Sequence, residues 1–175
     1  PMRDISSLPN KDEWRITKRN DDNSMRINTS CIVPIIDLET QNILHSQMYD
    51  EWKKNETRVE EYMIEDAEIV IAAYGISARI AKAVIKQLRE ENIKAGLIRP
   101  ITLFPFPQKS YSALDKKKVK NVICLEMSYP PQLMEDIRAY VDDEIQVDHF
   151  GRSGGILMTP DEAYEAIKKI TGGTK

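Results

Sequence analysis

The chain has 175 residues, of which 41% are hydrophobic and 30% are charged, and this composition is typical of a globular domain with a full core, not of a disordered or fibrous protein. Its formal net charge of −3 offers no basic surface to a phosphate backbone, so we expect no nucleic-acid partner. No apolar run approaches the ~20 residues of a spanning helix and the N-terminus lacks a signal peptide, so we expect a cytoplasmic protein without a membrane partner.

The first 38 residues show no clear hydrophobic period and contain clusters of Asn, Asp, Ser and Pro. Such a segment is typical of loops or an edge hairpin, so we expect an irregular extension or the remnant of a preceding domain. Beyond it, Leu44, Met48 and Trp52 recur every four residues among many charged side chains. This pattern predicts a long, mostly exposed helix over residues 39–62, in a connecting segment that runs to residue 65.

Residues 66–175 alternate between strand-like and helix-like segments. Residues 69–73 form an unbroken apolar run, which is typical of a strand covered on both faces. From Ile76 onward, apolar residues recur at helical spacing while most basic residues fall outside the stripe. The expected order is strand 68–74, helix 76–91, strand 95–99, a short helix near 108–116, strand 120–125, helix 131–141, strand 145–149 and helix 160–170. This alternation predicts an α/β domain with a mainly parallel sheet and helices on both faces.

The last helix carries the clearest start signal. Thr159 stands at the N-cap, Pro160 at the first helical position and Glu162 at the third, which is the pattern of a capping box. Two glycines, Gly172 and Gly173, stand near its expected end.

Ligands and partners of an open parallel sheet meet the carboxyl ends of its strands, so the candidate site residues are those in the loops at that edge. Gly75 and Ser77 stand at a helix N-terminus, where free N–H groups could hold an anion, although a tight turn with a Ser cap is the simpler interpretation. Arg99 ends one strand and Glu126 ends another, so the two could form an ion pair. Arg99 could instead meet an external carboxylate or phosphate.

Two further loops complete this set. Phe104 and Phe106 alternate with prolines in a rigid loop and could anchor a subunit contact or pack inside the domain. The run that starts at Gly151 and contains Arg152 and Gly154 could form a backbone nest for an anion or a permissive turn.

The sequence shows no autonomous catalytic site. His45 and His149 are isolated, and Cys31 and Cys124 lie far apart without a CxxC pair. These spacings suit neither a metal nor an iron–sulfur cluster, so we expect no catalytic residue and no metal site in this chain.

Four segments resemble the C-terminal part of the alpha subunit of 2-oxoacid:ferredoxin oxidoreductases, and within that family they are most like the 2-oxoisovalerate and 2-oxoglutarate type. They are AYGISARIAKAVIK, GLIRPITLFPFP, VICLEMSYPPQLMEDIRAYV and HFGRSGGILMTPDEAYEAI. The resemblance covers about residues 55–170, and the RPITLFPFP block after a βαβ unit is its most specific part. The chain departs from the family pattern at residues 128–131 and at Ser153, where the family often has Asn or Gly and a GRPGG loop.

The resemblance implies a fold like the C-terminal domain of transketolase, with three αβα layers around a five-stranded, mostly parallel sheet in which one edge strand can be antiparallel. It also implies thiamine diphosphate-dependent oxidative decarboxylation of a 2-oxoacid to acyl-coenzyme A, with iron–sulfur clusters passing electrons to ferredoxin. In the family, a preceding pyrimidine-type domain and the beta subunit bind thiamine diphosphate, and other domains or subunits carry the clusters.

We therefore expect this chain to be the C-terminal domain, or a truncated alpha subunit, of such an oxidoreductase. It would bind none of these cofactors and be inactive alone, with the thiamine-binding beta subunit and the cluster-bearing subunit as partners and a homodimer as a further option. The candidate residues would then shape an interface or the surroundings of the active site. Two alternatives stay open, namely a free-standing anion- or nucleotide-binding module that uses the Gly75 and Gly151 loops, and the equivalent domain of a transketolase or a 2-oxoacid dehydrogenase.

Overall fold

The structure, a computed structural model, describes residues 35–172. The irregular extension predicted for the first 38 residues therefore lies almost entirely outside the described residues. The chain divides between Ile43 and Leu44 into two units, and each is described by itself. The predicted domain boundaries after residues 38 and 65 stay predictions.

Helix α1 spans Ile35–Asn55, and strand β1 spans Val59–Tyr62. The prediction of a helix through residue 62 is therefore wrong beyond Asn55. β1 runs antiparallel to strand β3, with Val59 opposite Pro100 and Tyr62 opposite Leu97. Main-chain groups of an open sheet edge need partners, and this long-range pairing outweighs the local helical pattern.

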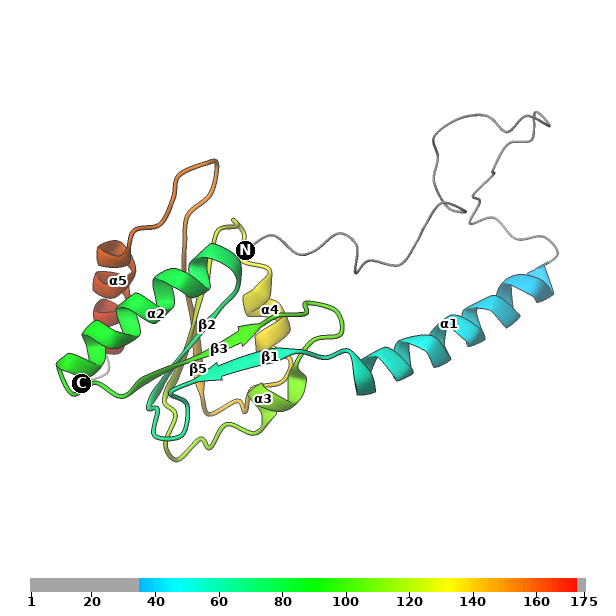
Figure 1. Cartoon of the computed structure of the whole chain (residues 1–175), viewed down its shortest axis with the longest axis horizontal. Helices are drawn as coiled ribbons and strands as arrows, with labels where there is room; N and C mark the ends of the chain where they lie inside the picture. Colours follow the sequence, from blue (N-terminus) through cyan, green and yellow to red (C-terminus); the bar gives the residue numbers. More distant parts are fainter. Residues whose placement is uncertain (1–34, 173–175) are drawn as a thin grey trace, which may run out of the picture. The chain divides into compact units, whose positions relative to one another are not determined.

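Five strands form one sheet in the order β1-β3-β2-β4-β5. Figure 1 shows β1 beside β3 at one end of this order. The four strands after β1 are β2 (Ile69–Ala73), β3 (Ala95–Pro100), β4 (Asn121–Glu126) and β5 (Gln146–Gly151). These four are parallel to one another, and only β1 is antiparallel among the described strands. The predicted α/β fold with a mostly parallel five-stranded sheet is confirmed.

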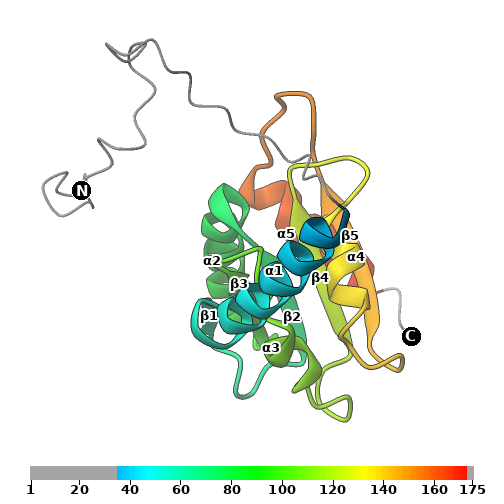
Figure 2. The same cartoon turned by 90° about the vertical axis from the view of Figure 1, so that its right-hand side faces the viewer.

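Helices cover both faces of this sheet, as Figure 2 shows. They are α2 (Gly75–Glu90), α3 (Gln108–Ser112), α4 (Leu133–Arg138) and α5 (Pro160–Gly172). One hydrophobic core lies beneath α2 and α5 and includes Ile71, and a second lies beneath α3 and α4 and includes Val70. The three-layer arrangement is confirmed, although α3 and α4 are shorter than predicted. No helix in residues 35–172 is long and apolar enough to cross a membrane.

The predicted capping box at the start of α5 is confirmed. The Thr159 N–H donates to Glu162 Oε2 at 3.0 Å, and the Glu162 N–H donates to Thr159 Oγ1 at 3.2 Å. This reciprocal pair satisfies two N–H groups that a helix start leaves without partners.

Candidate functional site

The loops that hold the predicted site residues leave the same edge of the sheet, because β2, β3, β4 and β5 are parallel. We call this surface the carboxyl edge and define it by residues 74–78, 101–107, 127–132 and 152–159. The loop between β5 and α5, orange in Figures 1 and 2, projects from the domain on this side. The prediction that these loops share one edge is confirmed.

Gly75 is the first residue of α2 and has a φ of +57°, a left-handed conformation that glycine adopts without strain. Tyr74 precedes it as the N-cap residue, and no side chain caps this helix start. Ser77 is buried inside the first turn. The tight turn is confirmed, whereas the Ser cap is wrong because Ser77 lies too far into the helix to serve as its N-cap.

Arg99 does not pair with Glu126, so that prediction is wrong. The Arg99 guanidinium donates through Nη1 to Glu60 on β1 at 2.9 Å, and Lys82 on α2 binds the same carboxylate. The hydrogen bond from Lys82, supported by the one from Arg99, holds the pKa of Glu60 below its ordinary value, although burial opposes this. Side chains alternate along a strand, so Arg99 lies on the α2 side of the sheet with Leu97. Glu126 instead lies on the α4 side.

Glu126 holds the start of α4 in place. Its carboxylate is 1% exposed and accepts hydrogen bonds from the backbone N–H groups of Gln132 and Leu133 at 3.0 to 3.1 Å. The Cys124 thiol donates to the same carboxylate at 3.7 Å. Burial, together with this nearby negative charge, raises the pKa of Cys124, so the thiol stays protonated and is a poor nucleophile.

The two phenylalanines of the proline-rich loop have different surroundings. Phe106 stacks between Tyr111 and Tyr140, with ring centroids 5.3 and 5.7 Å away, so it packs inside the domain. Phe104 is 59% exposed and meets the rings of Tyr49 and Trp52 on α1 edge-on, at 5.6 and 6.4 Å. Phe104 is therefore more available to a partner than Phe106, which is partly buried.

The end of β5 needs glycine because the chain passes close to β4. A Cβ at Gly151 would lie 2.3 Å from the Glu126 carbonyl oxygen and 2.7 Å from His149 Nε2. Burial lowers the pKa of His149, against the opposing influence of Glu126, so this imidazole is neutral near pH 7. The following loop contains Gly154 in a left-handed conformation, with a φ of +64°.

Arg152 forms an ion pair with Glu162 in the first turn of α5. Hydrogen bonds from the Thr159 backbone and from Arg152 lower the pKa of Glu162. Because its guanidinium is committed to this pair, Arg152 fastens the loop to α5, and the backbone nest at Gly151 to Gly155 stays a prediction. The structure thus favours a structural role for Arg152 over anion binding.

Two features of the described residues did not follow from the sequence patterns. The first is a cleft of about 750 Å³ between β5 and α5, lined by His149, Phe150, Arg152, Glu162, Glu165, Ala166, Lys169 and Ile170. The second is a set of exposed apolar side chains along the carboxyl edge. Apolar residues within the loop sequences PITLFPFP, SYPP and GGIL could have indicated this set. In residues 35–172, no three His, Cys, Asp or Glu side chains lie together as metal ligands.

Comparison with known proteins identifies relatives. The family described as pyruvate:ferredoxin oxidoreductase core domain II matches residues 67–163. Ketoisovalerate oxidoreductase subunit VorB of Methanothermobacter marburgensis is 40% identical over 144 residues, which is 82% of this chain and 40% of that protein. 2-Oxoglutarate synthase subunit KorA of Methanocaldococcus jannaschii is 31% identical over 136 residues, 77% of this chain and 36% of that protein. This chain thus spans about two fifths of the length of these curated relatives.

Solved structures show the same fold at lower identity. The 2-oxoglutarate:ferredoxin oxidoreductase from Magnetococcus marinus, solved with 2-oxoglutarate, coenzyme A and succinyl-CoA bound, aligns with a TM-score of 0.67 and 20% identity. The alignment covers 85% of this chain and 27% of that one. A split-gene transketolase aligns with a TM-score of 0.54 and 20% identity over 64% of this chain and 40% of its own.

Proposed function

Because the chain belongs to the core domain II family of 2-oxoacid:ferredoxin oxidoreductase alpha subunits, we propose that it works within an enzyme that oxidises a branched-chain 2-oxoacid to its acyl-coenzyme A. The observation that carries this proposal is the 40% identity to a ketoisovalerate oxidoreductase subunit over 144 residues. Its role is to assemble the complex and to shape the surroundings of the active site, and it is inactive alone.

Two described residues, Cys124 and Glu126, do not suit an iron–sulfur cluster or thiamine diphosphate. Cys124 is a buried, protonated thiol, whereas a cluster ligand must be a thiolate with room for iron. Glu126, the buried carboxylate at the carboxyl edge, already accepts two backbone N–H groups. The proposal therefore assigns thiamine diphosphate, the clusters and coenzyme A to other parts of the complex, and its partners are a thiamine-binding beta subunit, a cluster-bearing subunit and, through them, ferredoxin.

The predicted site residues divide into two roles under this proposal. Phe104 touches a partner, since it is the exposed aromatic residue among them. The others shape and hold the loops, by left-handed turns, burial or ion pairs. They are Gly75, Ser77, Arg99, Phe106, Glu126, Arg152 and Gly154.

Reconstitution tests the proposal. The full chain is co-expressed with proteins of its source organism that correspond to the partner subunits of VorB and to the part of VorB that this chain does not match. The expected result is a stable complex that reduces a viologen dye when 2-oxoisovalerate and coenzyme A are added, while the chain alone is inactive. The proposal fails if the chain elutes as a monomer beside those subunits, or if it shows the activity without them.

A further inference from the structure

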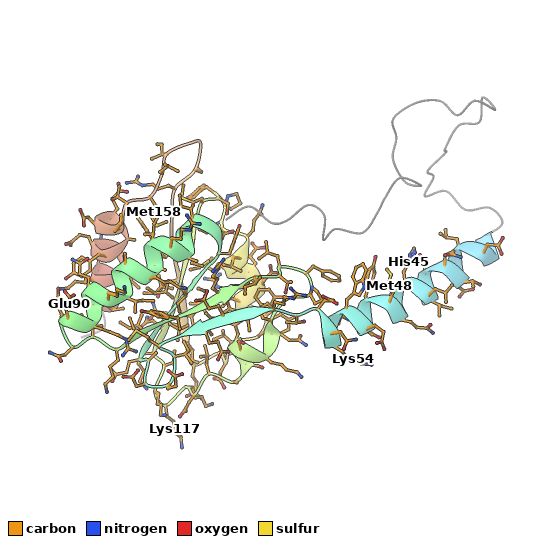
Figure 3. The ribbon with its side chains drawn as sticks, in the orientation of Figure 1. His45, Met48, Lys54, Glu90, Lys117 and Met158 are labelled. Carbon is orange, nitrogen blue, oxygen red and sulfur yellow. The ribbon has the colours of Figure 1, made fainter. Side chains whose placement is uncertain are left out.

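The two edges of the sheet differ in chemistry. Seven large apolar side chains at the carboxyl edge are exposed by 51% to 79%, namely Ile76, Ile101, Leu103, Phe104, Tyr129, Ile156 and Leu157. The loops at the opposite, amino edge expose Met63 by 39%, and many of their other residues are charged. The charged residues there include Glu65, Asp66, Lys94, Lys116, Lys117, Lys118, Asp142 and Asp143. Figure 3 shows Lys117 projecting into solvent there. Apolar exposure is therefore concentrated where strands β2 to β5 end.

Folding does not explain this concentration. An exposed apolar side chain buries little area within its own domain, and exposed apolar side chains gathered at one edge of a sheet are typical of an interaction site. The set contains Phe104 and Tyr129, and aromatic residues are enriched at the centres of protein interfaces. Tyr49 and Trp52 on α1 lie against Phe104 and extend the aromatic part of this surface.

Charges on the helices that begin at the carboxyl edge are arranged by side. Helices α2 and α3, which follow the neighbouring strands β2 and β3, carry the basic residues Arg79 and Lys109 near their starts. Helices α4 and α5, which follow the neighbouring strands β4 and β5, carry acidic residues in their first turns, namely Glu135, Asp136 and Asp161. No ion pair joins any of these five side chains within residues 35–172. A partner would therefore need acidic groups facing the β2–β3 half and basic groups facing the β4–β5 half.

We propose that the carboxyl edge, through Leu103, Phe104, Tyr129, Ile156 and Leu157, is the docking surface for another folded domain of the same oxidoreductase, one with an apolar patch and the opposite order of charges. This inference rests on the proposed function and names its surface. Relatives at 40% identity match this chain over only 40% of their length, so most of their polypeptide lies outside the matched part and can supply such a domain. That length favours another domain over a second copy of this chain.

The experiment uses the full chain and the co-expressed oxidoreductase subunits described above. Leu103→Asp and Leu157→Asp place a charge in the apolar surface, and each should weaken the complex at least about tenfold in Kd, because a desolvated charge without a partner is costly at an interface. Lys117→Asp introduces the same side chain at the amino edge and should leave Kd within about twofold. Arg79→Glu should chiefly slow association, and the slowing should fade at high salt.

The outcomes separate the two proposals. If the wild-type chain forms no complex, the proposed function fails. If it forms one that Leu103→Asp and Leu157→Asp leave intact, the function stands and the docking surface is wrong. A wild-type homodimer that these variants dissociate, with subunit binding unchanged, would overturn the choice of partner. Circular dichroism melting checks that each variant folds, and Leu157→Ser replaces Leu157→Asp if that variant does not.

Discussion

Replacing Glu126 with alanine should lower the free energy of unfolding of the domain by about 2–4 kcal/mol. Two backbone N–H groups, those of Gln132 and Leu133, lose their acceptor, and each buried group left without a partner costs about 1–3 kcal/mol. The sum of about 2–6 kcal/mol is reduced because the variant no longer keeps a buried carboxylate away from water.

Glu126→Gln provides the matched comparison. The amide keeps one acceptor oxygen of the same size and in the same place, but its NH₂ group faces backbone donors, so about 1–2 kcal/mol should be lost. Glu144→Ala is the surface control, because the Glu144 side chain is 72% exposed and its ion pair with Lys116 is solvated. It should change the stability little.

Urea unfolding at pH 7, followed by circular dichroism, measures all three variants against the wild-type chain. The reasoning requires the order Glu126→Ala, Glu126→Gln, Glu144→Ala from most to least destabilised. A loss below about 1 kcal/mol for Glu126→Ala would show that water or the α4 backbone readily replaces the carboxylate. An equal loss for alanine and glutamine would show that side-chain volume, not hydrogen bonding, matters at this position.

Three further variants test other parts of the domain. Gly151→Ala should destabilise it by about 2 kcal/mol or more in urea unfolding, because its Cβ would lie 2.3 Å from a carbonyl oxygen, and an unchanged midpoint would contradict this. Phe106→Ala should cost about 2–3 kcal/mol in the same assay, because Phe106 is stacked between two rings and partly buried against the core. Phe104→Ala should cost less than about 1 kcal/mol, because Phe104 is 59% exposed. Hydrogen bonds from the Thr159 backbone and from Arg152 lower the pKa of Glu162, and the stability that this shift contributes is present above the ordinary carboxylate pKa and is lost as the pH falls through the lowered pKa. Glu162→Gln should therefore flatten the fall of Tm below about pH 5, and an unchanged slope would count against these two hydrogen bonds.

The sheet and its helices could be predicted because each signal is local and periodic. Residues 69–73 form an unbroken apolar run, and the start of α5 carries a complete capping box. Strand β1 has neither kind of signal. It has four residues, two of them glutamates, and it forms only because β3 offers an open edge about forty positions along the chain. A pairing of that kind depends on the assembled sheet and not on the segment itself.

The error at Arg99 and Glu126 has a related cause. Both residues end strands at the same edge, and that much follows from their positions in parallel strands. Side chains along a strand point alternately to the two faces of the sheet, so the face on which each of these residues lies depends on the face to which the first residue of its strand points. β3 and β4 are apolar on both faces, so hydrophobicity does not distinguish the two. Only the assembled sheet shows that Arg99 lies with α2 and Glu126 with α4.

The residues that hold this domain together and those that we propose to contact a partner are largely separate. Glu126, Gly151 and Arg152 lie at the base of the carboxyl-edge loops and shape them, whereas Leu103 and Leu157 lie in the same loops and are mostly exposed. Changes at the base should therefore alter stability first and assembly only as a consequence. Changes at Leu103 and Leu157 should alter assembly while the melting temperature of the isolated chain stays the same. Such a loss of assembly without a loss of stability is expected only if these apolar side chains contact another protein surface.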